Sequence, residues 1–294
     1  MADTDPSTRP GTELVTPELL RDWPLPDPSS SKKARGQVVI VGGAARTPGA
    51  VALGGLAALR VGAGHVQLAV ASSVAPALAA GFPEAGVIGL PETDGGTVAG
   101  RAAAETCAEA VAGADAVLIG PGLDDADEAA ALLDGLWEHL DDKAIVLDAY
   151  ALGILPDFED RLRDGSHRCV LTPNPNELAR LLERDCEPTL DDVLDAARRY
   201  SSCVTAQMLI ADTDGRTWRV PSGHAGLATA GSGDVLAGLA VGLLARGVEP
   251  AHAACWATYL HGTAGERLAS AVGGIGFLAR ELVDQVPPVL AELS

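Results

Sequence analysis

Short apolar runs rich in β-branched residues alternate with longer segments rich in Ala and Leu along most of the chain. Short apolar runs are typical of buried strands, whereas longer segments with apolar positions at helical spacing predict helices. The predicted strands cover 37–41, 65–70, 87–90, 115–120, 144–149, 169–172, 203–211 and 216–220. The predicted helices cover 49–61, 74–80, 99–112, 126–138, 175–184, 190–200, 233–246, 250–271 and 278–292. This alternation predicts an α/β protein with a doubly wound, mainly parallel sheet flanked by helices on both faces.

The beginning of the chain has a different amino-acid composition. Residues 1–34 are rich in Pro, Ser, Thr and charged side chains, which predicts a flexible leader with one short helix near 17–21. No linker and no internal repeat divides the remainder, so we expect residues 35–294 to form a single domain.

Composition and charge narrow the classes of partner. Hydrophobic residues make up 47 % of the chain but aromatic residues only 3 %, so the core must consist mainly of Ala, Val, Leu and Ile. The net charge of −19, from 40 acidic and 21 basic residues, repels nucleic acids and anionic membranes. No apolar run is long enough to span a bilayer, so we expect a cytoplasmic protein. The five cysteines are scattered without a CxxC pair, which argues against disulfides and against a zinc site.

An excess of acidic residues with few lysines also suits a salt-rich cytoplasm, because salt screens the repulsion between like charges. A halophilic source is therefore a hypothesis, which a melting scan across molar KCl would test.

Four segments with candidate chemistry follow predicted strands, at 42–50, 120–123, 172–177 and 230–234. In an open parallel sheet, ligands bind beyond the carboxyl ends of the strands. We therefore expect these segments to share one edge of the sheet, although the glycine-rich segments 42–50 and 120–123 are weak signals when taken singly.

The most specific segment is ATAGSGDVLAGLAVGLLARG at 228–247. Gly231, Ser232 and Gly233 precede Asp234 at the start of a predicted helix, so their backbone amides could hold a phosphate at the helix N-terminus. A carboxylate beside such a site could accept a proton from a hydroxyl group that attacks phosphorus. The structural alternative is that Asp234 only caps the helix after a glycine turn.

A second segment, TPNPNE at 172–177, places Asn174 between two prolines and Glu177 in the first turn of a predicted helix. Glu177 could merely complement the helix dipole, or it could orient a metal-bound water beside a phosphate. Asp148 ends a predicted strand at the same edge, and His224 lies just before the phosphate loop, where it could contact a ligand.

The motifs of this chain resemble those of a known family. They are GQVVIVGGAARTPGAVALGGLAALRVGAGHVQLAV, GPGL, VLDA, LTPNPNELARLL and AGSGDVLAGLAVGLLARG, and they stand in the right order and spacing across 35–290. The chain resembles the ADP-dependent (S)-NAD(P)H-hydrate dehydratases of the ribokinase-like superfamily. The resemblance implies a ribokinase-like fold, commonly assembled as a homotetramer, and a reaction that removes water from NAD(P)HX. That reaction restores NAD(P)H and converts ADP to AMP and phosphate.

The resemblance also implies roles for particular residues. Asp234 would be the catalytic residue that activates the hydroxyl of the hydrate. The residues expected at the hydrate, besides Asp234, are Ala50, Gly122 and Asn174; those expected at the adenine nucleotide are Ser232, Gly233, Ala206 and Gln207. Mg²⁺ would be held near Glu177 through water.

The chain departs from the family pattern at four positions. Asn174 replaces a usual His, Asn176 a Gly, and Tyr150 an Asp. Val204 stands where the family has the lysine of a Lys-Gly pair, and loss of a lysine at a diphosphate weakens binding by about 1–3 kcal/mol.

Two other functions fit parts of the pattern. A kinase of a small alcohol on the same scaffold would share the GSGD loop, whereas the GGAARTPGA segment favours the dehydratase. A nucleotide-binding paralogue with impaired catalysis is favoured by the changes at Asn174 and Val204 and opposed by Asp234.

Overall fold

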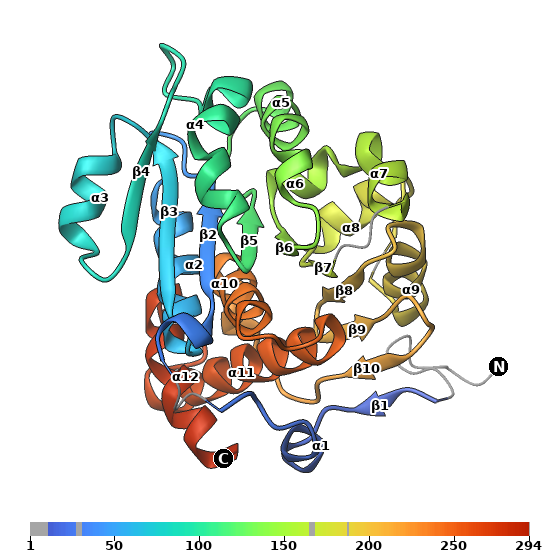
Figure 1. Cartoon of the computed structure of the whole chain (residues 1–294). Coiled ribbons are helices and arrows are strands. Elements are labelled where there is room, and N and C mark those ends of the chain that lie inside the picture. The colour runs from blue at the N-terminus through green and yellow to red at the C-terminus, as the bar shows by residue number, and fades with distance from the viewer. Residues whose placement is uncertain (1–10, 28–30, 165–167, 187, 294) are drawn as a thin grey trace.

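A computed structural model describes residues 11–27, 31–164, 168–186 and 188–293. Its centre is one ten-stranded sheet with the order β1-β10-β9-β8-β7-β6-β5-β2-β3-β4 (Figure 1). All neighbouring pairs from β4 to β8 are parallel, whereas β9 runs antiparallel to both β8 and β10. The strands are β1 (Glu13–Leu14), β2 (Gln37–Val41), β3 (His65–Ala71), β4 (Gly86–Leu90), β5 (Ala116–Ile119), β6 (Ala144–Leu147), β7 (Arg168–Leu171), β8 (Cys203–Ala206), β9 (Leu209–Ala211) and β10 (Thr217–Arg219).

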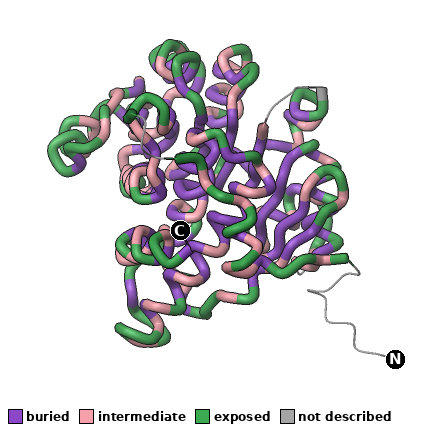
Figure 2. Tube along the Cα trace, turned by 60° about the horizontal axis from the view of Figure 1, so that its bottom comes forward, coloured by how far each residue is buried: buried purple, intermediate pink, exposed green. Residues whose placement is uncertain are grey.

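Helices cover both faces of the sheet, as the sequence predicts. They are α1 (Pro17–Asp22), α2 (Gly49–Arg60), α3 (Ala75–Gly81), α4 (Gly100–Ala112), α5 (Ala126–Leu136), α6 (Tyr150–Gly153), α7 (Glu159–Asp164), α8 (Pro175–Leu181), α9 (Leu190–Arg199), α10 (Ser232–Ala245), α11 (Pro250–Ala271) and α12 (Ala279–Leu293). Strand β2 shows why both faces need cover: Val38 and Ile40 join one buried cluster, and Val39 and Val41 join the other. Figure 2 shows the resulting band of buried strands inside a more exposed outer layer.

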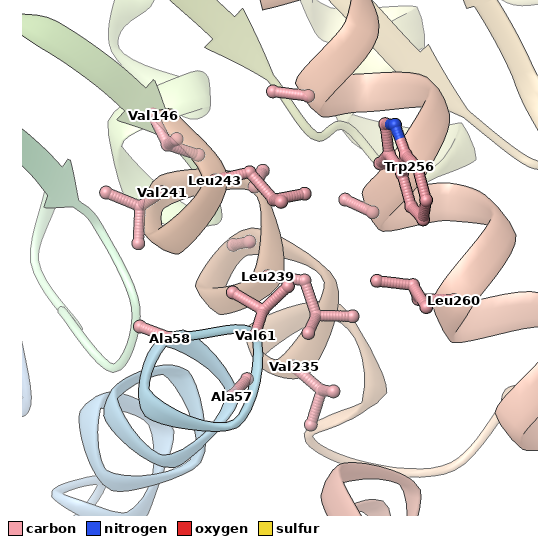
Figure 3. Packing of buried hydrophobic residues seen from close by; sticks show 14 of the residues in the cluster. Ala57, Ala58, Val61, Val146, Val235, Leu239, Val241, Leu243, Trp256 and Leu260 are labelled. Carbon is pink, nitrogen blue, oxygen red and sulfur yellow. The ribbon is translucent and has the colours of Figure 1, made fainter. Parts of the chain in front are cut away.

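One core cluster depends on a very close approach of two helices. Helices α2 and α10 pack side by side against one face of the sheet. Ala57 and Ala58 of α2 and Val235 and Leu239 of α10 belong to this cluster (Figure 3). A Cβ atom at Gly238 would lie only 2.3 Å from the carbonyl oxygen of Gly54, so only glycine fits there. This contact fixes the position of α10 and therefore of its N-terminus.

Part of the expected leader is instead a structured part of the fold. Strand β1 pairs with β10, and Val15 and Leu20 are fully buried. The ring of Trp23 stacks on that of His252 with centroids 4.0 Å apart. The prediction of a flexible leader over 1–34 is wrong for residues 13–22, because their few apolar side chains pack against segments distant in sequence. The short helix predicted near 17–21 is present as α1. Residues 1–10 and 28–30 lie outside the described residues.

The predicted strand over 203–211 is in fact a hairpin of β8 and β9. Gln207 and Met208 form its turn with φ values of 49° and 66°. Two consecutive residues with positive φ match the tight hairpin turn that follows the twist of the strands, which usually contains Asn and Gly. The sequence lacks that signal, so the pattern predicts one strand where the structure has two.

Candidate functional site

The candidate site lies at the carboxyl edge of the sheet, where the strand order reverses between β2 and β5. The loops that follow these strands are bound to each other. The amide of Gly43 donates to the carbonyl of Pro121 at 2.8 Å, and the amide of Ala44 donates to that of Gly122 at 2.8 Å. The hydroxyl of Thr47 also donates to Gly122 O, at 2.7 Å. The glycine-rich segments 42–50 and 120–123 therefore form one rim.

The N-terminus of α10 points into the same region. Gly231 adopts a left-handed conformation with φ of 86° immediately before Ser232, the first residue of the helix. The first amides of a helix lack intrahelical acceptors, so those of Gly233 and Asp234 are available to an anion. Leu53 of α2 packs so closely that a Cβ atom at Gly231 would lie 2.5 Å from its Cδ1 atom. The turn is thus fixed by packing as well as by glycine.

Asp234 is partly buried in the first turn of α10. Burial, reinforced by the charge of Glu177, raises the pKa of Asp234 to about 6. A carboxylate with a pKa near neutrality is suited to accept a proton at physiological pH. Its second, structural interpretation as a cap does not hold, because Gly231 occupies the N-cap position and no side-chain cap bond is present there.

A second carboxyl group stands nearby at the end of β6. Asp148 is 5 % exposed, and burial raises its pKa to about 7, with further upward shifts from Asp234 and Glu177. The hydroxyl of Thr172 donates to its Oδ1 atom at 2.8 Å and partly offsets these effects. The residue that follows, Ala149, has a φ of 52°, and such strain in a residue other than glycine is typical of functional sites.

Glu177 and Asn174 hold each other in place at the start of α8. The Asn174 amide donates to Glu177 Oε2 at 2.8 Å, and the Glu177 amide donates to Asn174 Oδ1 at 3.0 Å. This capping box gives Glu177 a structural role at the start of the helix. The sequence predicted such a role only through the attraction between Glu177 and the helix dipole. Burial nevertheless raises the pKa of Glu177, although the Asn174 amide and the charge of Arg180 act in the opposite direction. The charge of Glu177 in turn raises the pKa values of Asp148 and Asp234.

A cavity of about 660 Å³ opens beside the N-terminus of α10. Four of the predicted site residues line it: Asn174, Gln207, Ser232 and Gly233. His224 also lies in its wall, where its Nδ1 atom accepts from the Gly226 amide at 3.0 Å. The lining residues that the sequence did not predict include Ser222, Leu227, Leu236, Thr258 and His261. Most are apolar or lie in an unremarkable helical pattern, and only the tertiary fold brings them together.

Other predicted residues, among them Asp234 and Glu177, do not line this cavity. Ala206 is buried at the end of β8, next to the lining residue Gln207. Ala50 and Gly122 meet at the rim, where a Cβ atom at Gly122 would be 3.2 Å from that of Ala50. The carbonyl oxygen of Asp234 lies 3.5 Å from a Cβ atom built at Gly54, so α2 connects this rim to α10.

The structure shows where two of the residues that depart from the family pattern lie. Val204 is fully buried in the core and does not line the cavity. Its correspondence to the phosphate-binding lysine of the family stays a prediction, and in this chain the side chain packs in the core. Tyr150 is 42 % exposed, immediately after the strained Ala149.

No described helix combines the length and the apolar character that crossing a membrane requires. The described cysteines are all free, as expected, and four of the five are buried.

Comparison with known proteins identifies the relatives of this chain. The family model described as NAD(P)H-hydrate dehydratase matches residues 38–288. The chain is 43 % identical to the ADP-dependent (S)-NAD(P)H-hydrate dehydratase of Xanthomonas campestris, over 97 % of this chain and 99 % of that protein. It spans about half the length of the bifunctional NAD(P)H-hydrate repair enzymes that it also matches.

Solved structures agree with this. The ADP/ATP-dependent NAD(P)H-hydrate dehydratase of Bacillus subtilis, co-crystallised with ATP and Mg²⁺, superposes with a TM-score of 0.77 at 27 % identity, covering 96 % of this chain and 99 % of that one. A ribokinase-like superfamily protein of Enterococcus faecalis superposes with a TM-score of 0.80 at 23 % identity and 98 % coverage of both chains, which confirms the predicted fold class. Together, the match over residues 38–288 and the close full-length relative show that this chain belongs to the NAD(P)H-hydrate dehydratase family.

Proposed function

We propose that this protein dehydrates (S)-NAD(P)HX to NAD(P)H and converts ADP to AMP and phosphate. Family membership supports the reaction, and the observation that carries it is the partly buried carboxyl group of Asp234 in the first turn of α10, directly after the cavity-lining residues Ser232 and Gly233. Hydroxide is a poor leaving group, so the hydroxyl of the hydrate first takes a phosphoryl group from ADP. Phosphate then leaves with the C–O electron pair, a ring proton is lost, and the double bond forms.

Each proposed step uses a group of this chain. Asp234 accepts the proton of the hydrate's hydroxyl group as its oxygen attacks phosphorus. The amides of Gly233 and Asp234 donate to the phosphoryl oxygens, where they stabilise the charge of the transferring group. The rim of Ala50 and Gly122, with Asn174, would hold the hydrate, and Gln207 with Ala206 would adjoin the nucleotide.

The carboxyl groups also fit a Mg²⁺ ion that is held mainly by nucleotide phosphate. Among the described residues, no cluster of three or more His, Cys, Asp or Glu side chains is suited to hold a metal alone. Mg²⁺ in phosphate sites usually takes one or two carboxylates, several waters and phosphate oxygens. Glu177 would supply one such carboxylate, directly or through water. The capping bond engages its Oε2 atom, so Oε1 would face the ion or its water. The bound ion would offset the charge of the phosphates.

Replacing Asp234 tests the proposal. We expect Asp234→Asn to lower the rate of NADHX conversion by about 10²- to 10⁴-fold, because the general base is lost while the shape is kept. The measurement is the recovery of absorbance at 340 nm with NADHX, ADP and Mg²⁺, in buffer with and without molar KCl. Asp127→Asn is a matched control, since Asp127, like Asp234, lies in the first turn of a helix but is exposed.

Three results would contradict the proposal. They are a wild-type protein that leaves NADHX unchanged, an Asp234→Asn variant with full activity, or an Asp127→Asn variant that is equally impaired. Consumption of nucleotide only with another small alcohol would indicate a kinase, and nucleotide binding without turnover would indicate an inactive paralogue. Tetrameric assembly and a cytoplasmic location stay predictions.

A further inference from the structure

A buried histidine stands behind the first residue of α10. The Nε2 atom of His261, on α11, lies 2.8 Å from the hydroxyl oxygen of Ser232. Both residues are 5 % exposed, and both line the cavity. Burial lowers the pKa of His261 to about 4, so the ring is neutral at physiological pH and carries a single N–H group.

The other ring nitrogen indicates where that proton is. Nδ1 of His261 is buried and has no hydrogen-bond partner among the described residues. A proton on Nδ1 would leave a buried donor unsatisfied, and such donors are rarer than unsatisfied acceptors. The favoured tautomer therefore carries its proton on Nε2, which donates to the Ser232 hydroxyl oxygen.

This arrangement decides what Ser232 can do. Its oxygen accepts from His261, so its own hydrogen is free for a further acceptor. Ser232 begins α10, next to the free amides of Gly233 and Asp234, so that acceptor is best supplied by an anion at the helix N-terminus. We propose that His261 is a positioning residue that holds the Ser232 hydroxyl as a hydrogen-bond donor to a phosphoryl group of the adenine nucleotide. The identity of the anion rests on the proposed function.

A second unsatisfied atom lies in the wall of the same cavity. Ser222 Oγ is buried without a partner in the described structure. It would lie 2.8 Å from a Cβ atom at Gly262, the residue after His261. Buried polar atoms without partners are uncommon, and this one, like Nδ1 of His261, belongs to a residue that lines the cavity.

The test measures ADP binding by calorimetry for four variants. We expect Ser232→Ala and His261→Leu each to weaken ADP binding by about tenfold, since the first removes a charge-assisted hydrogen bond and the second removes the contact that orients it. The double variant should be no weaker than Ser232→Ala alone, because His261 acts through Ser232. His261→Gln should stay within about threefold of wild type, because its amide can place a donor near the position of Nε2.

Steady-state kinetics and the polar variant His261→Asn distinguish a positioning role of His261 from a purely structural one. We expect the KM for ADP in His261→Leu to rise about tenfold while kcat changes by less than about threefold, as expected for a contact made throughout the reaction. The side chain of His261→Asn is too short to reach Ser232, so this variant should bind ADP as weakly as His261→Leu. If His261→Leu fails to fold, His261→Asn takes its place in the test. Leu260→Val lowers stability in the same helix but leaves the hydrogen bond between His261 and Ser232 in place, so its ADP affinity should equal that of wild type.

Several results would overturn the inference. These are additive losses in the double variant, unchanged affinity in both His261→Leu and His261→Asn, or equal losses in His261→Gln and His261→Asn. A wild-type protein that binds neither ADP nor inorganic phosphate would also overturn it. A wild-type protein that binds ADP but does not convert NADHX contradicts only the proposed function, and the coupling of His261 to Ser232 is then judged on ADP binding.

Discussion

At the scale of single residues, the site is defined by carboxyl groups whose pKa values rise on burial. Asp234 has a pKa of about 6 and Asp148 of about 7, and each is raised further by a neighbouring carboxylate. The sequence correctly identified the acidic side chains at this edge. It could not show that Asp148 is almost fully buried, because burial depends on packing between elements far apart in the chain.

The pKa of Asp148 predicts a pH dependence of stability. Its ordinary value of 3.8 applies to the unfolded chain, so between about pH 4 and pH 7 the folded state holds more protons at this group. Its contribution to stability is therefore lost as pH rises through that window. Asp148→Asn should thus gain stability relative to wild type, by about 1–3 kcal/mol at pH 8 compared with pH 4.

Urea unfolding of wild type and Asp148→Asn at pH 4, 6 and 8 measures this difference. The exposed Asp127→Asn variant should show no such trend. A constant difference between wild type and Asp148→Asn at all three pH values would show that Asp148 ionises normally in the folded state.

At the scale of secondary structure elements, the alternating pattern predicted most of the sheet and its covering helices. The pattern failed where elements lack local signals. Helix α7 has the sequence EDRLRD, which has no apolar stripe, and the turn at Gln207 and Met208 lacks the usual glycine. Strand β1 has only two residues and exists because β10 is there to pair with it.

The contact between α2 and α10 predicts a sharp steric limit. Gly238→Ala would place a Cβ atom 2.3 Å from a backbone oxygen of Gly54, which cannot rotate away. We expect the free energy of unfolding to fall by about 1–3 kcal/mol, and activity to fall as the N-terminus of α10 shifts. Denaturant unfolding and the NADHX assay measure both effects.

Gly153→Ala, in α6, is the matched control, because a Cβ atom there meets nothing within 4 Å. It should be neutral or slightly stabilising. Equal stability of Gly238→Ala and wild type would show that the two helices can separate without loss.

At the scale of the whole molecule, charge dominates the surface. The net charge is −19, and like charges meet even within one helix, as at Glu105 and Glu109 on the exposed side of α4. Salt shortens the range of this repulsion from about 10 Å at 0.1 M to about 3 Å at 1 M.

We therefore expect the melting temperature to rise with KCl between 0.1 and roughly 2 M, because screening removes repulsion in the folded state. Differential scanning calorimetry would show it, and Glu105→Gln/Glu109→Gln should show a smaller rise. A melting temperature that is flat or falls with added KCl would contradict both this expectation and the hypothesis of a halophilic source.

By itself, the sequence determined the α/β alternation, the glycine turn before Asp234, and the family to which the chain belongs. These features depend on neighbours within a few residues, where apolar spacing and glycine leave a readable pattern. Only the tertiary structure decided that residues 13–14 add a strand to the sheet, that Val204 lies in the core, and that the side chain of His261 lies within hydrogen-bond distance of Ser232. Each of these depends on burial and contact between segments remote in sequence, which no local pattern encodes.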